Sequence, residues 1–256
     1  MIGNKNMKDK KEIFIVEELE DLSINPKICP LSADIREICI KHLRTNPILD
    51  NGQMVCLNCT EDIQIKIFDF FQKILIEFIE SEKKINECYE IKNIYSLHIN
   101  NINNTNKYIK MNFDIIINMD RVYKYLWNIS KLLVDGIESY ENYMMWQKQT
   151  TNIKDEIREE WNLIYSIRNE IEHPKNLTTT FFERIGNNII VPQIIYKNKK
   201  YDLLQLATKS IQCVYIFVKA IIGASILYSK YVVAFTDEER TKIFLNEKNK
   251  MKNLDV

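Results

Sequence analysis

Hydrophobic side chains recur every three or four residues along much of this chain, which is the spacing of a helix that buries one face. The first long stripe begins after Thr60, a capping residue that is followed by two acidic residues. It predicts a helix of about 25 residues. The stripe comprises Ile67, Phe71, Ile74 and Phe78. The polar stretch at residues 99–107 is then predicted to be a loop.

A second stripe predicts another long, continuous helix. Its members are Met119, Val122, Leu126, Ile129, Leu133, Ile137, Tyr140 and Met144. Two further helices are predicted, one from a capped start at Asn152 to Pro174 and one beginning near Tyr201. The inward positions of the last are Leu203, Ala207, Val214, Phe217, Ile221 and Tyr228.

Shorter elements flank these helices. Residues 13–23 are apolar without a clear period, and Ser32 is expected to cap a short helix. Residues 176–200 are β-prone with Pro192 in the middle, which indicates an extended crossing or a small hairpin. Thr236 opens a capping box for a short last helix. The helix after Ser32 has one face made of Ile35, Ile38, Cys39 and His42.

The pattern therefore predicts an all-α fold. We expect an up-and-down helical bundle of four to five long helices, with a short extended or hairpin insertion before the last long helix. Residues 1–55 are expected to form an N-terminal appendage packed on the bundle. Residues 56–248 form the bundle itself, with the insertion at about 176–200, and residues 249–256 are a polar tail.

Composition narrows the functional classes. Only five Gly and five Pro occur in 256 residues, which favours long helices over sheets with tight turns. Lys plus Arg equals Asp plus Glu at 35 each, whereas a non-specific nucleic-acid binder carries a basic excess. The six Cys show no disulfide-framework spacing, and no apolar signal core opens the chain. A reducing cytoplasm is the expected location.

The apolar stretch at residues 213–235 raises the question of a membrane helix. Lys219 and Lys230 interrupt it and leave about ten uncharged residues between them, which is too few to span a bilayer. The stretch is therefore expected to be a buried core helix.

The predicted fourth helix has an arginine on its buried stripe. That stripe runs Ile157, Trp161, Ile164, Arg168 and Ile171. An unpaired buried guanidinium is expensive, so Arg168 must face a partner, a water-filled groove or a ligand anion. Asn169 and His173 are four residues apart and share a helix face. His173 precedes Pro174, so it lies at the helix C-terminus, where the helix dipole favours a protonated imidazole.

The segment Arg168–His173, read as Arg-Asn-x-x-x-His, resembles the signature of the HEPN superfamily. The resemblance implies an all-α bundle with the motif on a late helix, and a metal-independent RNase without cofactors. It also implies a homodimer with the motif helices of both subunits at the interface. Many such proteins are toxins or antiviral effectors, so a cognate antitoxin or a nucleotidyltransferase is a further expected partner.

The same resemblance assigns roles to three residues. His173 would take the 2′-hydroxyl proton or protonate the leaving oxygen, Arg168 would stabilise charge on the scissile phosphate, and Asn169 would orient the phosphate or the histidine. The expected product is a 2′,3′-cyclic phosphate. Because the family also has members without this activity, the alternative is a non-catalytic module that binds a partner protein or a nucleotide.

Simpler interpretations of these residues stay open. Arg168 could pair with Glu172, four residues on, and His173 could cap the last carbonyls. Lys197, Lys199 and Lys200 could flank an RNA groove or stand in a solvated loop. Four residues could together bind zinc, but two of them fall on an apolar helix face, so no metal is expected. They are Cys39, His42, Cys56 and Cys59.

Overall fold

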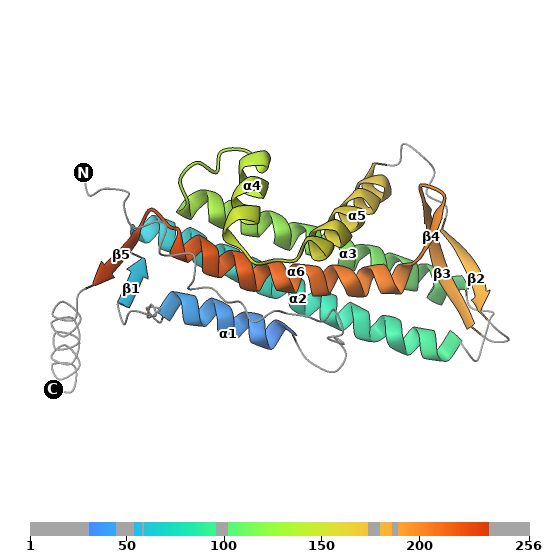
Figure 1. Cartoon of the computed structure of the whole chain (residues 1–256). Helices are drawn as coiled ribbons and strands as arrows, with labels where there is room; N and C mark the ends of the chain where they lie inside the picture. The colour runs from blue at the N-terminus through green and yellow to red at the C-terminus, as the bar shows by residue number, and fades with distance from the viewer. Residues whose placement is uncertain are drawn as a thin grey trace, which may run out of the picture.

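The computed structural model describes residues 31–44, 54–57, 59–95, 102–173, 180–185 and 189–235. Most of them are helical, which confirms a mainly α-helical fold class (Figure 1). The helices are α1 (Leu31–Arg44), α2 (Glu61–Tyr95), α3 (Ile102–Leu133), α4 (Tyr140–Thr150), α5 (Asp155–Glu172) and α6 (Leu203–Leu227). The strands are β1 (Met54–Leu57), β2 (Thr180–Ile185), β3 (Ile189–Tyr196), β4 (Lys199–Asp202) and β5 (Val232–Phe235).

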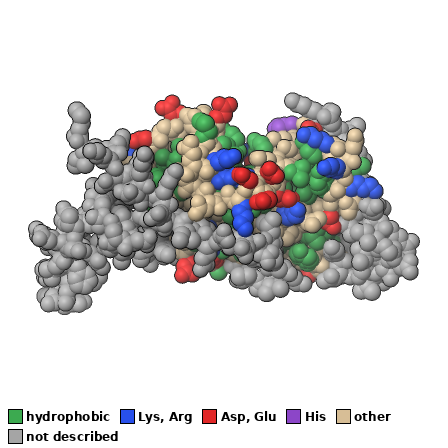
Figure 2. Space-filling view, viewed as in Figure 1, with side chains coloured by type: hydrophobic (Ala, Val, Ile, Leu, Met, Phe, Trp, Pro, Cys, Tyr) green, Lys and Arg blue, Asp and Glu red, His purple; other side chains and the backbone are tan. Residues whose placement is uncertain are grey.

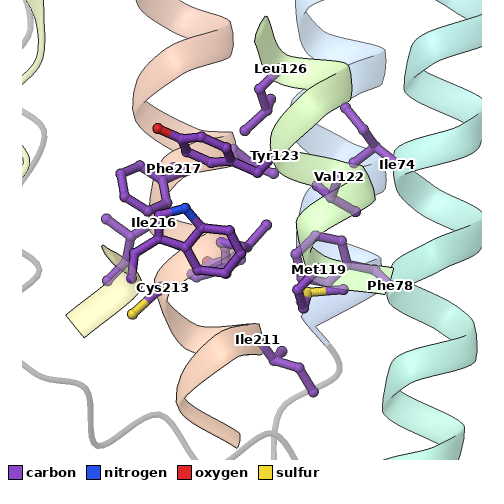
Figure 3. Packing of buried hydrophobic residues seen from close by; sticks show 14 of the residues in the cluster. Ile74, Phe78, Met119, Val122, Tyr123, Leu126, Ile211, Cys213, Ile216 and Phe217 are labelled. Carbon is purple, nitrogen blue, oxygen red and sulfur yellow. The ribbon is translucent and has the colours of Figure 1, made fainter. Parts of the chain in front are cut away.

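The helices stack in three layers. The middle layer is α3 with α6, and Figure 1 shows α4 and α5 on one side of it and α1 and α2 on the other. Contacts agree with this view, since α2 packs on α3 and α6, and α5 packs on the same two helices. Figure 3 shows the shared core, where Ile74 and Phe78 of α2 approach Met119 and Val122 of α3, with Phe217 of α6 nearby.

Most of the predicted inward positions of α2 and α6 are buried. All four predicted positions of α2 lie in the core, and so do Leu203, Ala207, Val214, Phe217 and Ile221 of α6. The α6 helix is apolar and long enough to cross a membrane, but 94% of its most apolar window is buried inside the protein. A helix that is apolar on all sides and enclosed by others is a core helix, as the interrupting lysines had indicated.

The predicted helix from Met119 to Met144 is wrong as a single element. The chain leaves the helix after Leu133 and turns at Gly136, whose φ is +80°, before α4 begins. This left-handed conformation suits glycine because it has no Cβ to clash with the backbone. Ser139 then caps α4 by accepting a hydrogen bond from the backbone N–H of Asn142.

Three further predictions, each about where a helix begins, were wrong. The predicted loop at 99–107 is helical from Ile102 onward, because α3 extends further toward its N-terminus than the asparagine-rich sequence suggests. Asn152 does not cap α5, which begins at Asp155 after Lys154. Ser32 lies inside α1, and its hydroxyl and backbone N–H bind the Glu82 carboxylate of α2 instead of capping.

The predicted insertion before the last long helix is a three-stranded antiparallel sheet in the order β2-β3-β4. Pro192 fits because, at that point, β3 pairs only with Phe182 of β2. Lys197 and Asn198 form the two-residue turn between β3 and β4, with φ of 48° and 62°.

A second sheet was not predicted. In it β1 pairs antiparallel with β5, because α6 ends at Leu227 and the chain turns back into a strand. The apolar element at 13–23, the short helix after Thr236 and the tail at 249–256 lie outside the described residues.

Candidate functional site

The site begins with how α5 is held. Its buried side chains include Ile157, Trp161, Ile164 and Ile167, which pack toward α3 and α6. The helix ends at Glu172, and His173 is the C-cap, with its backbone N–H donating to the Asn169 carbonyl at 2.9 Å. The predicted end before Pro174 is therefore confirmed.

Arg168 has carboxylate partners on two helices. Its Nη2 lies 3.0 Å from Oδ2 of Asp120 on α3 and 2.5 Å from Oε2 of Glu172. The Arg168 side chain is 11% exposed, whereas that of Asp120 is 1% and that of Glu172 is 28% exposed. The arginine on the seam thus faces a buried acid, and the ion pair with Glu172 considered from the sequence also forms.

Two neighbours complete the charge cluster. The Arg168 Nη1 donates to Oδ1 of Asn169 at 2.9 Å, and Lys124 Nζ lies 2.8 Å from the Asp120 carboxylate. The cluster holds two cations, Arg168 and Lys124, and two anions, Asp120 and Glu172. Its formal charge is therefore zero, although it contains the residues expected to bind a phosphate.

The central ion pair is incompletely hydrogen bonded. Arg168 Nε and both carboxylate oxygens of Asp120 are buried, yet none of them has an aligned hydrogen bond within the described structure. Arg168 Nη2 and Lys124 Nζ approach Asp120 at ion-pair distance, so attraction between charges holds the carboxylate. Buried polar groups are nearly always bonded, so each exception calls for an explanation, of which a catalytic role is one.

Arg158, ten residues earlier on α5, shows what a fully bonded buried arginine looks like here. Its Nη1 donates to Oε1 of Gln147 at 2.6 Å, and its Nη2 donates to Oγ1 of Thr151 at 2.8 Å. Its Nε and Nη2 also bind the carbonyls of Ile153 and Gln147. Burial lowers the pKa of Arg158, but every part of its guanidinium is satisfied, so it ties α4 to α5.

His173 is exposed, and within the described ranges its imidazole makes no hydrogen bond. The structure brings Arg168 and Asn169 together but does not bring the imidazole to them. Five residues separate Arg168 from His173, or roughly 140° around the helix. One copy of α5 therefore presents the two side chains in different directions.

The three lysines lie on the β3–β4 hairpin and are exposed. Lys197 Nζ stands 5.2 Å from the ring centre of Tyr196, while Lys199 and Lys200 begin β4. Figure 1 shows this sheet at the same end of the molecule as the C-terminus of α5. On the face that carries α4 and α5, Figure 2 shows basic and acidic side chains intermixed.

The two described thiols of the candidate zinc set, Cys39 and Cys59, are poor metal ligands. Cys39 is buried in α1, and burial raises its pKa to about 12, which disfavours the thiolate that metals bind. Cys59 is half-buried before α2, and burial raises its pKa too. Within the described residues, no three His, Cys, Asp or Glu side chains gather as a metal site. The side chains of His42 and Cys56 lie outside that description.

A cavity of about 400 Å³ lies elsewhere, at the start of α6. Its lining includes Tyr89 of α2, with Gln205, Thr208 and Lys209 of α6. None of Arg168, Asn169 or His173 borders it, so the end of α5 is a surface site and this cavity is separate from it.

Asp120 and Lys124 were not among the site residues expected from the sequence. Asp120 is buried, but it is one position beyond Met119 and so lies about 100° around the helix from the stripe that was followed. Arg158 was missed because it lies beside, and not on, the stripe that was followed.

Comparison of the chain with protein-family models, with curated proteins and with solved structures finds no match.

Proposed function

We propose that the C-terminal end of α5 is the catalytic site of a metal-independent endoribonuclease of the HEPN type. The observation that supports it most is the contrast between two arginines on one helix. Among the described residues, Arg158 is fully bonded, whereas Arg168 keeps a donor without a hydrogen bond and lies within one and a half turns of the exposed His173, whose imidazole has no partner there. A helix end of this kind is costly to build if it serves only packing.

The chemistry is an internal displacement at phosphorus. The ribose 2′-oxygen attacks the phosphorus, the bond from phosphorus to the 5′-oxygen breaks, and the products are a 2′,3′-cyclic phosphate and a 5′-hydroxyl. His173 takes the 2′-hydroxyl proton or gives a proton to the leaving oxygen. Arg168 stabilises charge on the phosphate oxygens, and Asn169, already bonded to Arg168, orients that guanidinium or the phosphate.

This proposal requires a second copy of the chain. One α5 presents Arg168 and His173 in different directions, so a homodimer through the motif helix would let the two copies share a cleft and supply one histidine as base and another as acid. An up-and-down HEPN-like arrangement of the helices is part of the same proposal. So do a cytoplasmic location and a role as a toxin or defence effector held in check by a cognate antitoxin or nucleotidyltransferase.

RNA binding must also overcome the acids around Arg168. The cluster is neutral as it stands, so a phosphate binds well only when Glu172, the more exposed of the two carboxylates, moves away. Lys197, Lys199 and Lys200 would add attraction for the flanking phosphates from the neighbouring sheet.

The test is cleavage of labelled single-stranded RNA by the purified chain with EDTA present. Wild type should yield ends that carry 2′,3′-cyclic phosphates, and His173→Ala should remove the activity without changing the unfolding temperature. Lys154→Ala, at the other end of α5, is a matched control and should cut normally. Equal cleavage by His173→Ala and wild type, or no cleavage by wild type of any RNA tried, would reject the proposal.

One observation favours a second candidate function. Arg168 already has two carboxylate partners, as expected of a non-catalytic HEPN-like helical module that binds a partner protein or a nucleotide beside them. In that case no RNA is cut, Arg168→Ala weakens binding of the partner, and His173→Ala has little effect. Binding measured by calorimetry against nucleotides, with both variants, separates the two candidates.

A further inference from the structure

The outward face of α2 carries large apolar side chains. Ile65 is 59% exposed, Phe68 49%, Ile76 55% and Ile79 51%. At about 100° per residue, the four fall within roughly 80° of the helix circumference, on the side away from the buried stripe. Isolated exposed hydrophobic residues need no explanation, but a continuous row along one helix marks an interaction surface.

The row is symmetric about Gln72. Ile65 and Ile79 lie seven residues on either side of it, and Phe68 and Ile76 lie four residues on either side. The same centre relates the charged residues that end the row, because Glu61 and Lys83 lie eleven residues on either side. We call residues Glu61, Ile65, Phe68, Gln72, Ile76, Ile79 and Lys83 the α2 stripe.

A helix face with this symmetry fits a second copy of itself. We propose that α2 pairs antiparallel with the α2 of another copy of this chain, around a two-fold axis at Gln72. Ile65 then meets the partner's Ile79, Phe68 meets the partner's Ile76, and the two central amides can hydrogen bond to each other. Self-complementary contacts of this kind define a two-fold dimer.

Charge selects the antiparallel direction. In this arrangement Glu61 faces the partner's Lys83 at both ends of the row, so two ion pairs form. A parallel pair would set glutamate against glutamate and lysine against lysine, which repel each other. The stripe covers about six helical turns, so the interface is at the small end of stable interfaces and the dimer should depend on concentration.

This surface is separate from the proposed active site. The α2 stripe is exposed and lies on the side of α2 away from its buried positions. The α5 helix packs on α3 and α6, on the opposite side of that middle layer from α2 (Figure 1). Pairing through α2 therefore leaves Arg168 and His173 uncovered, and it does not rest on the nuclease proposal.

The test is the molar mass of the full chain in solution, by light scattering and sedimentation over a range of concentrations. Wild type should reach at least twice the chain mass of 30.5 kDa, and Phe68→Glu should lower this mass, to that of the monomer unless copies also pair through α5. Glu61→Lys and Lys83→Glu should each weaken the dimer, by roughly fivefold to tenfold in dissociation constant. The double variant with both changes should restore it. Lys66→Glu, exposed on α2 but outside the stripe, is the control and should leave the dimer unchanged.

Several outcomes would overturn the proposal. One is a wild-type monomer at every concentration, and another is a double variant as weak as the single variants. A lower unfolding temperature of monomeric Phe68→Glu would mean that the chain itself covers the stripe. A mass that Phe68→Glu leaves unchanged would reject pairing through α2 and leave the nuclease proposal intact.

Discussion

The guanidinium of Arg168 lies 3.0 Å from the carboxylate of Asp120, across the contact between α5 and α3. The carboxylate is almost fully buried, so it neutralises the arginine from the inside of the protein, while Glu172 approaches from the outside. This relationship explains how an arginine can occupy a seam position, and it fixes the direction in which the side chain points.

Removing either partner of this pair should destabilise the fold. Asp120→Asn and Arg168→Met should each cost about 1–3 kcal/mol, because each leaves a buried charge with one counter-ion fewer. The double variant should cost less than the sum of the two single variants, since the charges that then lose a partner, Lys124 and Glu172, are the more exposed ones. Urea unfolding of the four proteins measures the coupling, and strictly additive losses would show that the two side chains do not interact.

Glu172→Gln should strengthen binding of RNA and of inorganic phosphate. The change removes the outer negative charge from Arg168 and leaves Asp120 to orient it, so the affinity for an anion should rise by about threefold to tenfold. Fluorescence anisotropy with labelled RNA measures the effect. Glu159→Gln, an exposed position on the same helix, removes an equal charge away from Arg168 and should have little influence. Equal effects of the two variants would point to net charge alone.

Gly136→Ala should destabilise the protein by about 1 kcal/mol. The cost comes only from the backbone, because φ is +80° and a Cβ built there would meet no atom within 4 Å. Gly136→Asn should cost less, since asparagine tolerates the left-handed region better. Thermal unfolding compares the two variants, and an alanine as stable as wild type would mean that the turn changes its conformation.

Buried thiols should make stability fall at alkaline pH. Burial raises the pKa of Cys213 from 9.0 to about 12, so the folded state holds the thiol proton that the unfolded state releases. This contribution is complete below pH 9 and is lost as pH rises toward about 12. The free energy of unfolding of wild type should fall between pH 8 and about pH 10.5. In Cys213→Ala this fall should be smaller by about 1–2 kcal/mol, because the titrating thiol is absent.

Labelling of the thiols checks the same point independently. In the native protein at pH 8, iodoacetamide should modify the half-buried Cys59 well before Cys39, Cys88 and Cys213, which are buried with pKa values raised to about 12. Rapid modification of Cys213 in the folded state would contradict both expectations.

The inward faces of the helices could be predicted because burial follows the helical period. The position of Arg168 in the stripe also predicted that its side chain needs a partner, but the sequence did not show which residue that partner is. Asp120 is on another helix, and which helices pack together is decided by the whole core. The break at Gly136 was hidden for a related reason: Ile137 is buried after the turn, so the hydrophobic spacing continues through it.

Caps were less predictable than stripes. Ser32 looked like a helix cap because serine commonly accepts a hydrogen bond from a nearby backbone N–H. In the fold its hydroxyl instead reaches Glu82, fifty residues away in sequence, and joins α1 to α2. A local propensity was overridden by a contact that exists only once the helices have packed.

The enclosed position of α6 has a consequence for synthesis on the ribosome. Among the described elements, α6 follows every other helix in the chain, yet it supplies the centre of the core. While residues 203–227 are still within the exit tunnel, α2, α3 and α5 have emerged with their apolar faces uncovered. Nascent chains paused before this segment should therefore be strong clients of chaperones, and translation of α6 is the step that closes the fold.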